Sequence, residues 1–350
     1  MKRKLGRSIV CSKESIFPNL CASKQNFLFT VSMASEKLFW DIPFGGDVTV
    51  PEDRSRFLRV HAASSSTSTS TSNVSSVGTA VILHGGYWKN KFGLDDAYGN
   101  AGVISLAPFF VQRGFSAVEV EYRRADHEGG GWPGTNEDCL EAMRLIAELR
   151  AAAESRTTSA EQPAAVASKL NIDDERCWQA CAALRPDRLL LVGHSAGGCL
   201  ALWSGHNCPG NAKVSAVLAL APVADLLKGH ELRISDDGDA IERYMHCVPD
   251  ASESSLQAYK EASPQCLLPV TFPLLVAWGD ADKDVPPDLV KSYADAASAM
   301  SPELVKALAI PEADHFAIVD AGSSAWKEHI VPALAEVLVD EEMKAALLAA

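Results

Sequence analysis

The sequence lacks any run of about 18 consecutive apolar residues, the length that a membrane-spanning helix requires. It also lacks an excess of basic residues: 32 Lys and Arg stand against 45 Asp and Glu, and the formal net charge is −13. Nucleic acids and anionic membrane surfaces would repel such a chain. We therefore expect a soluble protein whose main partner is neither a nucleic acid nor a membrane.

The nine cysteines include no C-x-x-C pair. An odd number of thiols without paired spacing is typical of a reduced, intracellular protein and not of a disulfide scaffold. Cys177 and Cys181 are spaced to share one helix face, but no nearby histidine completes a set of metal ligands. We expect no metal ion and no organic cofactor.

Residues 1–33 contain six basic residues and one acidic residue, so they differ in charge from the rest of the chain. Lys24, Gln25 and Asn26 interrupt the apolar stretch that a secretory signal would need. The composition fits an organelle transit peptide and, equally, an unprocessed disordered extension or an upstream start before Met33. The expected location is the cytoplasm, or a mitochondrion or plastid if this segment is a transit peptide.

With 350 residues and 47% apolar content, the chain is expected to form one large α/β domain over residues 34–345. The Ser/Thr tract at 64–76 cannot bury apolar surface and predicts a disordered loop. A looser Ser/Thr/Pro insertion is expected near 155–164. Residues 223–268 lack a strand pattern, which predicts a small helical cap.

Strand-like and helical segments alternate along the chain, which predicts a mostly parallel central sheet flanked by helices. Short apolar runs typical of buried strands occur at 57–60, 79–83, 115–121, 189–192, 214–220, 274–278 and 304–310. Helical patterns occur at 106–113, 136–150 and 287–300, and from residue 324 onward.

One of these strands, Leu189–Val192, runs directly into a G-x-S-x-G pentapeptide at 193–197. A hydrophobic strand before this motif and a helix-compatible run after it predict a nucleophile elbow, which presents the Ser195 hydroxyl above the end of the strand. The turn is too tight for side chains two positions either side of the serine, and this explains the glycines. The start of the helix directs free main-chain N–H groups toward a developing oxyanion.

A second glycine pair, Gly85 and Gly86, follows the predicted strand 79–83. Glycines at this position allow main-chain N–H groups to approach a ligand closely, as an oxyanion hole requires. Tyr87 and Trp88 come next. They either line a pocket for an aromatic leaving group or pack beneath the turn, and the sequence leaves both alternatives open.

A serine nucleophile needs a base, and the base needs an acid that fixes its tautomer. His315 follows the last predicted strand, which brings it to the same sheet edge as Ser195. Three aspartates, at 280, 282 and 284, compete for the role of the acid. Asp282 is preferred, because it stands three residues after the glycine that ends its strand and just before a Val-Pro pair. We expect the other two to be ordinary turn or helix-start carboxylates.

Four motifs together resemble the α/β-hydrolase superfamily over roughly residues 78–335, and their chain order, Ser, Asp, His, is that of this fold. The motifs are HGGYW at 84–88, GHSAGG at 193–198, GDADKDVP at 279–286 and ADHF at 313–316. HGGYW is similar to the oxyanion signature of the kynurenine formamidase (arylformamidase) and small-acyl esterase branch. EYRRA, GGGWPGT and HFAIVD also look like bacterial hydrolases of that branch whose substrates are mostly unassigned.

The resemblance implies a serine hydrolase that acts on a small-molecule ester or amide. It implies Ser195 as nucleophile, Asp282 as acid and His315 as base, with oxyanion donors at Gly85, Gly86 and Ala196. The first expectation is an arylformamidase of the N-formylkynurenine type; the alternative is a short-chain carboxylesterase of the acetyl- or feruloyl-esterase kind. A non-catalytic binding protein with this fold is a further alternative. The oligomeric state stays open, a homodimer included.

Overall fold

The computed structural model describes residues 39–45, 54–61, 76–95, 100–158 and 172–349. Residues Leu38–Ala350 form one compact unit. The predicted extension 1–33 and nearly all of the predicted loop 64–76 lie outside the described residues. None of the described helices combines the length and the apolar character that crossing a bilayer requires.

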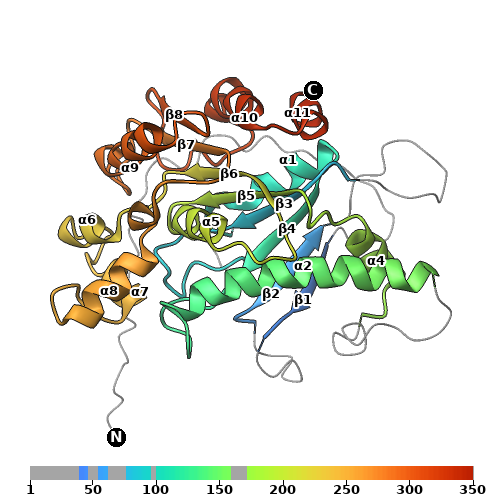
Figure 1. The fold of residues 1–350 in the computed structure, drawn as a ribbon, viewed down its shortest axis with the longest axis horizontal. Helices are drawn as coiled ribbons and strands as arrows, with labels where there is room; N and C mark the ends of the chain where they lie inside the picture. The colour runs from blue at the N-terminus through green and yellow to red at the C-terminus, as the bar shows by residue number, and fades with distance from the viewer. Residues whose placement is uncertain (1–38, 46–53, 62–75, 96–99, 159–171, 350) are drawn as a thin grey trace, which may run out of the picture. The chain divides into compact units, whose positions relative to one another are not determined.

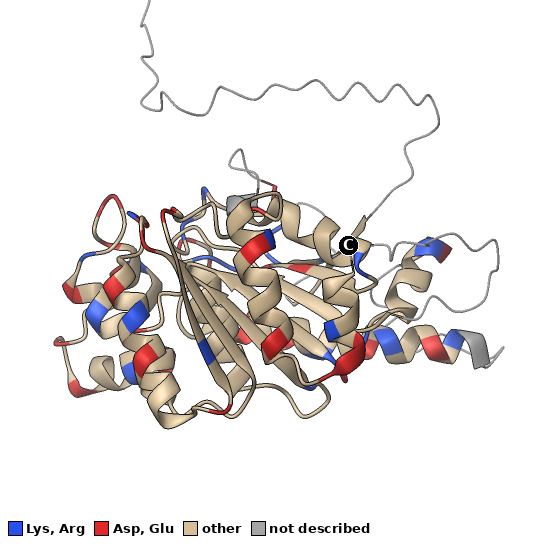
Figure 2. Ribbon diagram, turned by 90° about the horizontal axis from the view of Figure 1, so that it is seen from above, with Lys and Arg blue, Asp and Glu red and all other residues tan. Residues whose placement is uncertain are grey.

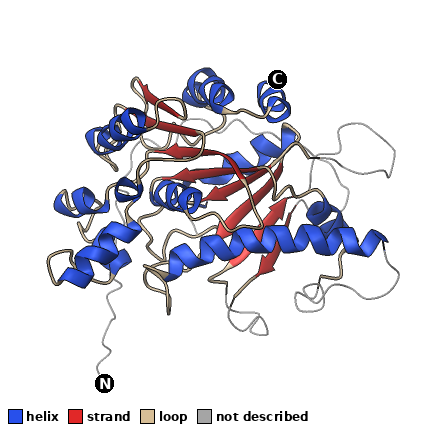
Figure 3. Ribbon diagram, viewed as in Figure 1, coloured by secondary structure: helices blue, strands red, loops and turns tan. Residues whose placement is uncertain are grey.

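One sheet of eight strands forms the centre of this unit, in the order β1-β2-β4-β3-β5-β6-β7-β8 (Figures 1 and 3). β2 pairs antiparallel with both β1 and β4, whereas the pairings from β4 through β3 to β8 are all parallel. The strands are β1 (Phe39–Pro43), β2 (Phe57–His61), β3 (Thr79–Leu83), β4 (Ser116–Glu121), β5 (Leu189–His194), β6 (Val214–Leu220), β7 (Leu274–Gly279) and β8 (Val305–Ile310).

Helices flank this sheet (Figures 1 and 3). The longer ones are α1 (Leu106–Gln112), α2 (Gly134–Thr158), α4 (Glu175–Ala182), α5 (Ala196–His206), α8 (Glu253–Ala262), α9 (Pro287–Met300), α10 (Val331–Val337) and α11 (Glu341–Leu348). The shorter ones are η1 (Asn100–Ser105), α6 (Leu226–Glu231), α7 (Ala240–Met245), η2 (Pro264–Leu267) and η3 (Ala325–Ile330).

The central strands β3, β5 and β7 are buried at every position. Burial on both faces explains why their sequences are continuous apolar runs and do not alternate with polar residues. Figure 2 shows a related division of residue types, with most Lys, Arg, Asp and Glu on helices and loops and few on the strands. The predicted α/β class with a mostly parallel sheet is confirmed.

The segment between β6 and β7 contains α6, α7, α8 and η2, and therefore has the helical character predicted for 223–268. It is attached to the loops that follow β3 and β4. The Nζ atom of Lys89 lies 2.6 Å from Oδ2 of Asp237, and the N–H of Trp132 donates to the carbonyl of Tyr244 at 2.7 Å. Its action as a cap over a site stays a prediction.

One strand differs from the sequence expectation. β1 was not expected, because five residues with alternating exposure at a sheet edge resemble a loop. α2 begins two residues before the expected range 136–150 and continues past it into the Ala-rich residues, for which the sequence indicates a continued or second helix. Of the expected insertion near 155–164, residues 155–158 are the last residues of α2 and the remainder lies outside the described residues.

Gly197 lies in the first turn of α5, where an added Cβ atom would come closer than 3.0 Å to the main-chain oxygens of Leu83 and His84. Gly197→Ala should lower the free energy of unfolding by about 1–3 kcal/mol, because α5 must shift off the end of β3. Gly210→Ala is the matched control, since a Cβ there meets nothing within 4 Å. Equal unfolding free energies for the two variants, measured by urea titration with circular dichroism, would contradict this prediction.

Candidate active site

Ser195 occupies the sharp turn between β5 and α5. Its φ of 58° and ψ of −118° lie in a region that residues with a side chain rarely adopt. The turn is held on both sides: the N–H of Ser195 donates to the carbonyl of Leu220 at 2.8 Å, and its carbonyl accepts from the N–H of Cys199 at 3.2 Å. A serine held in this conformation between a buried strand and a helix has the geometry of a nucleophile elbow.

The glycines on either side of Ser195 are required by packing. A Cβ atom on Gly193 would overlap the main chain of Gly197, and one on Gly197 would overlap the carbonyl oxygen of Leu83. The G-x-S-x-G spacing therefore follows from the close approach of strand, turn and helix. No larger residue fits at either position without moving the main chain.

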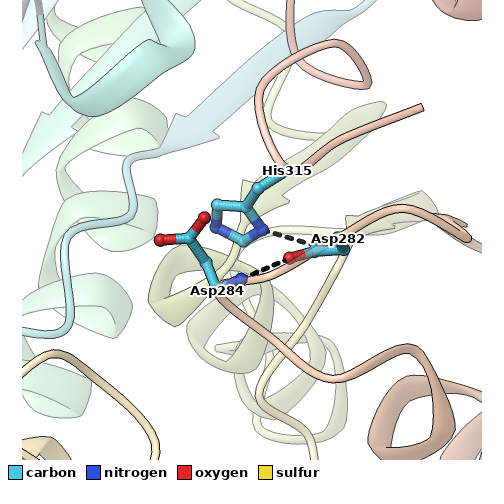
Figure 4. Close-up of side chains that lie close together, drawn as sticks. All are labelled: Asp282, Asp284 and His315. Carbon is cyan, nitrogen blue, oxygen red and sulfur yellow. Dashed lines mark hydrogen bonds and ion pairs between the residues drawn. The ribbon is translucent and has the colours of Figure 1, made fainter. Parts of the chain in front are cut away.

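Asp282 and His315 lie in the loops that follow β7 and β8, and their side chains are in contact (Figure 4). Nδ1 of His315 donates to Oδ2 of Asp282 at 2.6 Å. The other carboxylate oxygen accepts the N–H groups of Asp284 at 2.8 Å and Val285 at 2.9 Å, which fixes the orientation of the carboxylate. With the proton on Nδ1, Nε2 carries the lone pair and can accept a proton from a nucleophile.

The three candidate aspartates have different partners. Oδ1 of Asp280 accepts the N–H of Glu312 at 2.6 Å, and Oδ1 of Asp284 accepts the hydroxyl of Tyr87 at 3.2 Å. Among the described contacts, Asp282 is the aspartate that is hydrogen-bonded to the His315 ring. The D-x-x-V-P spacing therefore selects the carboxylate that contacts the histidine, and the catalytic role of that carboxylate stays a prediction.

His194 connects the nucleophile turn to the histidine loop. Its Nε2 donates to the carbonyl of His315 at 2.9 Å, and the two imidazole rings lie 4.4 Å apart between centroids. Because Ser195 is the next residue after His194, this contact holds the loop of His315 against the turn that bears the serine.

The loop after β3 lies against the other side of the nucleophile turn. A Cβ atom on Gly85 would be 2.9 Å from the carbonyl oxygen of His194 and 3.1 Å from Cβ of Ser195, so only a glycine allows this approach. Gly86 has a φ of 104°, which favours glycine. Ala196 is the first residue of α5, where N–H groups have no intrahelical acceptor. The predicted oxyanion donors therefore belong to two segments that meet at Ser195.

Tyr87 and Trp88 continue this loop with positive φ values of 54° and 55°. The Tyr87 hydroxyl donates to Asp284, and its pKa is raised far above the ordinary value, first by burial and then by the negative charge of Asp284. Trp88 is fully buried, and its ring stacks on Tyr244 of α7 with centroids 4.3 Å apart. Trp88 therefore packs against the segment between β6 and β7, and a role of Tyr87 or Trp88 in a substrate pocket stays a prediction.

Residues 84–89, which contain the predicted oxyanion donors Gly85 and Gly86, are called the oxyanion loop below. A buried polar group beneath this loop was not identified from the sequence. Oε1 of Glu121 lies 3.4 Å from Nε2 of His84 and 3.1 Å from Nη1 of Arg124. The Tyr122 hydroxyl donates to the carbonyl of His84, and the two rings stack at 4.3 Å. These contacts support the residue directly before Gly85. The signal in the sequence was EYRR at the end of β4, noted only as part of a resemblance.

One group of side chains among the described residues has the spacing of metal ligands: Asp282, Asp284 and His315 each offer an atom within 4.8 Å of the others. Both oxygens of Asp282, however, already accept hydrogen bonds, one of them from the His315 ring. A metal ion bound by these atoms would have to displace those donors. The arrangement therefore fits a carboxylate–histidine pair better than a metal site.

Comparison with known proteins bears on the fold and on the class of protein. The model of the prolyl oligopeptidase family (Peptidase_S9) matches residues 177–338, slightly less than half of the chain. Among the curated proteins, no sequence matches. The family model covers the segment from α4 to α10, which includes the nucleophile turn and the loops of Asp282 and His315.

Similar solved structures include several hydrolases. Esterase 2 of Thermogutta terrifontis, phosphoramylated by tabun, aligns with a TM-score of 0.54 and 15% identity over 88% of this chain and 92% of that chain. Esterase B of Lactobacillus rhamnosis, with a tributyrin phosphonate inhibitor, aligns with a TM-score of 0.56 and 15% identity, covering 88% and 86% of the two chains. A bifunctional GH43-CE protein of Bacteroides eggerthii aligns with a TM-score of 0.57 and 16% identity over 85% of this chain, which spans only 38% of that larger protein.

At this level of identity the solved structures establish the fold. They do not confirm the resemblance of HGGYW to the kynurenine formamidase branch. The chain has the α/β-hydrolase fold, and the match to the prolyl oligopeptidase family model indicates a serine hydrolase.

Proposed function

We propose that this chain is a serine esterase that hydrolyses small esters of short-chain carboxylic acids by two-step acyl transfer. The observation that carries the proposal is the buried hydrogen bond between Asp282 and His315, in a loop that His194 holds against the strained Ser195 turn. Serine, base and acid in this arrangement serve nucleophilic attack on a carbonyl carbon. The esterases among the structural neighbours support an ester in preference to an amide.

In the first step, Oγ of Ser195 attacks the ester carbonyl while Nε2 of His315 takes the hydroxyl proton. Asp282 stabilises the imidazolium that forms. The carbonyl oxygen becomes an oxyanion beside the N–H groups of Gly85, Gly86 and Ala196. When the tetrahedral intermediate collapses, the bond to the alcohol oxygen breaks and His315 returns the proton to that oxygen.

In the second step, water attacks the acyl-serine. His315 removes a proton from the water, and the same main-chain donors hold the second oxyanion. Collapse releases the carboxylic acid and returns the proton to Ser195. All proton transfers use one histidine nitrogen, so the mechanism needs no group beyond these residues and water.

The N-formylkynurenine type of substrate is the second candidate. HGGYW at 84–88 favours it, because this motif resembles the oxyanion signature of the arylformamidase branch. Burial of Trp88 favours the ester, because a side chain packed on α7 is less available to contact an aryl group. The ester is therefore the first choice and the aryl formamide the second.

We further propose that residues 223–268 act as a cap beside the site. Lys89 of the oxyanion loop is paired with Asp237 and Asp239 of this segment at 2.6 and 3.4 Å. Trp88 of the same loop stacks on α7. A segment joined to the oxyanion loop in this way can limit the size of the acyl group or of the alcohol.

Ser195→Ala should lower kcat by on the order of 10⁶, because no nucleophile remains. The same variant should lose covalent labelling by a fluorophosphonate probe. Ser204→Ala, at a buried serine of the same helix, is the matched control and should keep both activity and labelling. Labelling of the Ser195→Ala protein at the wild-type rate would exclude Ser195 as the nucleophile.

A substrate panel tests the choice between ester and formamide. p-Nitrophenyl acetate and butyrate should be hydrolysed with a higher kcat/KM than N-formylkynurenine, because the structural neighbours are esterases. A higher kcat/KM for N-formylkynurenine would reverse the order of the two candidates. Hydrolysis of none of these compounds by a folded protein that also fails to label would favour the binding-protein alternative.

Asp282→Asn should lower kcat by about 10⁴, since an amide in this position stabilises the wrong tautomer of His315. Asp280→Asn is the matched control, because the amide oxygen can still accept the N–H of Glu312, and its activity should stay within a fewfold of wild type. Ester hydrolysis measured for the two variants separates the roles. A severe loss in Asp280→Asn beside an active Asp282→Asn enzyme would contradict the assignment of the acid.

Incubation with EDTA should leave kcat unchanged, because proton transfer in this mechanism is carried by His315 and both oxygens of Asp282 are occupied by N–H donors. The measurement is the rate of ester hydrolysis before and after dialysis against the chelator. A large loss that added divalent metal restores would instead indicate a metal-activated water and would replace the serine mechanism.

A further inference from the structure

Asp284 is a carboxylate beside the proposed base, and it has no cationic partner among the described ion pairs. Its side chain is partly exposed, in contrast to the buried side chain of Asp282. Its Oδ1 accepts a hydrogen bond from the hydroxyl of Tyr87 at 3.2 Å. Among the described residues, this is the hydrogen bond made by the Asp284 carboxylate. A hydroxyl donor leaves the full negative charge in place. Asp284 therefore presents an uncompensated charge to whatever occupies the site.

The position of the Asp284 carboxylate relative to His315 determines which part of a substrate it can affect. One oxygen of Asp284, one oxygen of Asp282 and a ring nitrogen of His315 lie within 4.8 Å of one another. Figure 4 shows the Asp284 carboxylate on the side of the ring away from the hydrogen bond to Asp282, next to the edge that carries Nε2. In the proposed mechanism Nε2 returns the proton to the departing alcohol. The alcohol portion of the substrate therefore passes close to Asp284.

The surroundings of Tyr87 add negative charge to this region. After burial, the causes of its raised pKa are Asp284, then Asp236 of the segment between β6 and β7, then Asp282. A phenol with a raised pKa stays protonated and continues to donate to Asp284. Lys89, from the same loop, is already paired with Asp237. The Tyr87 hydroxyl therefore faces three carboxylates, those of Asp284, Asp236 and Asp282.

We infer that Asp284, oriented by the Tyr87 hydroxyl, is a specificity determinant that favours esters whose alcohol carries a positively charged ammonium group. The inference rests on the proposed esterase function. A carboxylate within 4.8 Å of a ring nitrogen of His315 attracts a cationic alcohol throughout acylation and repels an anionic one. The net charge of −13 extends the same preference to the approach of the substrate.

Two esters of the same shape test this inference. Acetylcholine carries a trimethylammonium group, and its neutral carbon isostere carries a tert-butyl group at the same position. The quantity measured is kcat/KM for acetylcholine divided by kcat/KM for the neutral isostere. The intrinsic reactivities of the two esters differ, so the change of the ratio on mutation is decisive and its absolute value is not.

Asp284→Asn should lower this ratio about tenfold, mainly through acetylcholine, because the amide keeps the size of the side chain and removes its charge. The N–H that Asp284 donates to Asp282 belongs to the main chain, so the acid is retained in the variant. Raising the ionic strength should lower the wild-type ratio in the same direction.

Asp288→Asn is the matched control. This exposed aspartate, four residues further along in the first turn of α9, should leave the ratio unchanged. An unchanged ratio in Asp284→Asn overturns the inference, as does an equal fall in Asp288→Asn.

Turnover of p-nitrophenyl acetate separates the two levels of the argument. If the protein hydrolyses this ester while the ratio is insensitive to Asp284→Asn, only the specificity inference fails. If it hydrolyses no ester and takes up no fluorophosphonate, the proposed function fails, and the inference fails with it.

Discussion

The arrangement of the site depends on one close contact, between the first turn of α5 and the end of β3. Gly197 touches the carbonyl oxygen of Leu83 so closely that no side chain fits between them. This contact holds the start of α5 beside the loop that begins at His84. It also forces the chain at Ser195 into its strained conformation, because strand and helix must meet without an intervening loop. The proposed nucleophile and the proposed oxyanion donors are therefore positioned by the same packing constraint.

The proposed base and the proposed acid reach this point because the sheet is parallel. β5, β6, β7 and β8 are consecutive neighbours, so the loops that follow them open at one edge. Asp282 and His315 come from two of these loops, and their side chains are almost fully buried. A buried carboxylate is costly unless it is hydrogen-bonded, and Asp282 accepts three N–H groups. Its orientation toward the ring is fixed before any substrate arrives.

Much of this architecture could be predicted from local sequence. Strands buried on both faces appear as apolar runs, and the expected strand 214–220 agrees with β6 residue for residue. β1 was missed because an edge strand with alternating exposure has no such run. The G-x-S-x-G turn and the choice of Asp282 both depend on spacings of a few residues, which a sequence displays directly.

Contacts between distant parts of the chain could not be predicted in this way. Tyr87 and Asp284 are 197 positions apart, and neither residue alone indicates the other. The pairing of His84 with Glu121 beneath the oxyanion loop is of the same kind. Trp88 shows the limit most clearly, since its place in the motif does not indicate that its ring stacks on Tyr244 of α7. Local pattern identifies the reacting groups, and long-range packing decides what surrounds them.

The oxyanion loop connects these surroundings to the chemistry. Gly86, Tyr87 and Trp88 all have positive φ, and non-glycine residues in this region cost of order 1–3 kcal/mol each. Contacts from two directions offset that cost: the Tyr87 hydroxyl is bonded to Asp284, and Lys89 is paired with the segment between β6 and β7. The main-chain N–H groups of this loop are thus held by the same residues to which we assign charge and space around the leaving alcohol. Under the proposed function, a change in either neighbour would alter substrate preference and oxyanion geometry together.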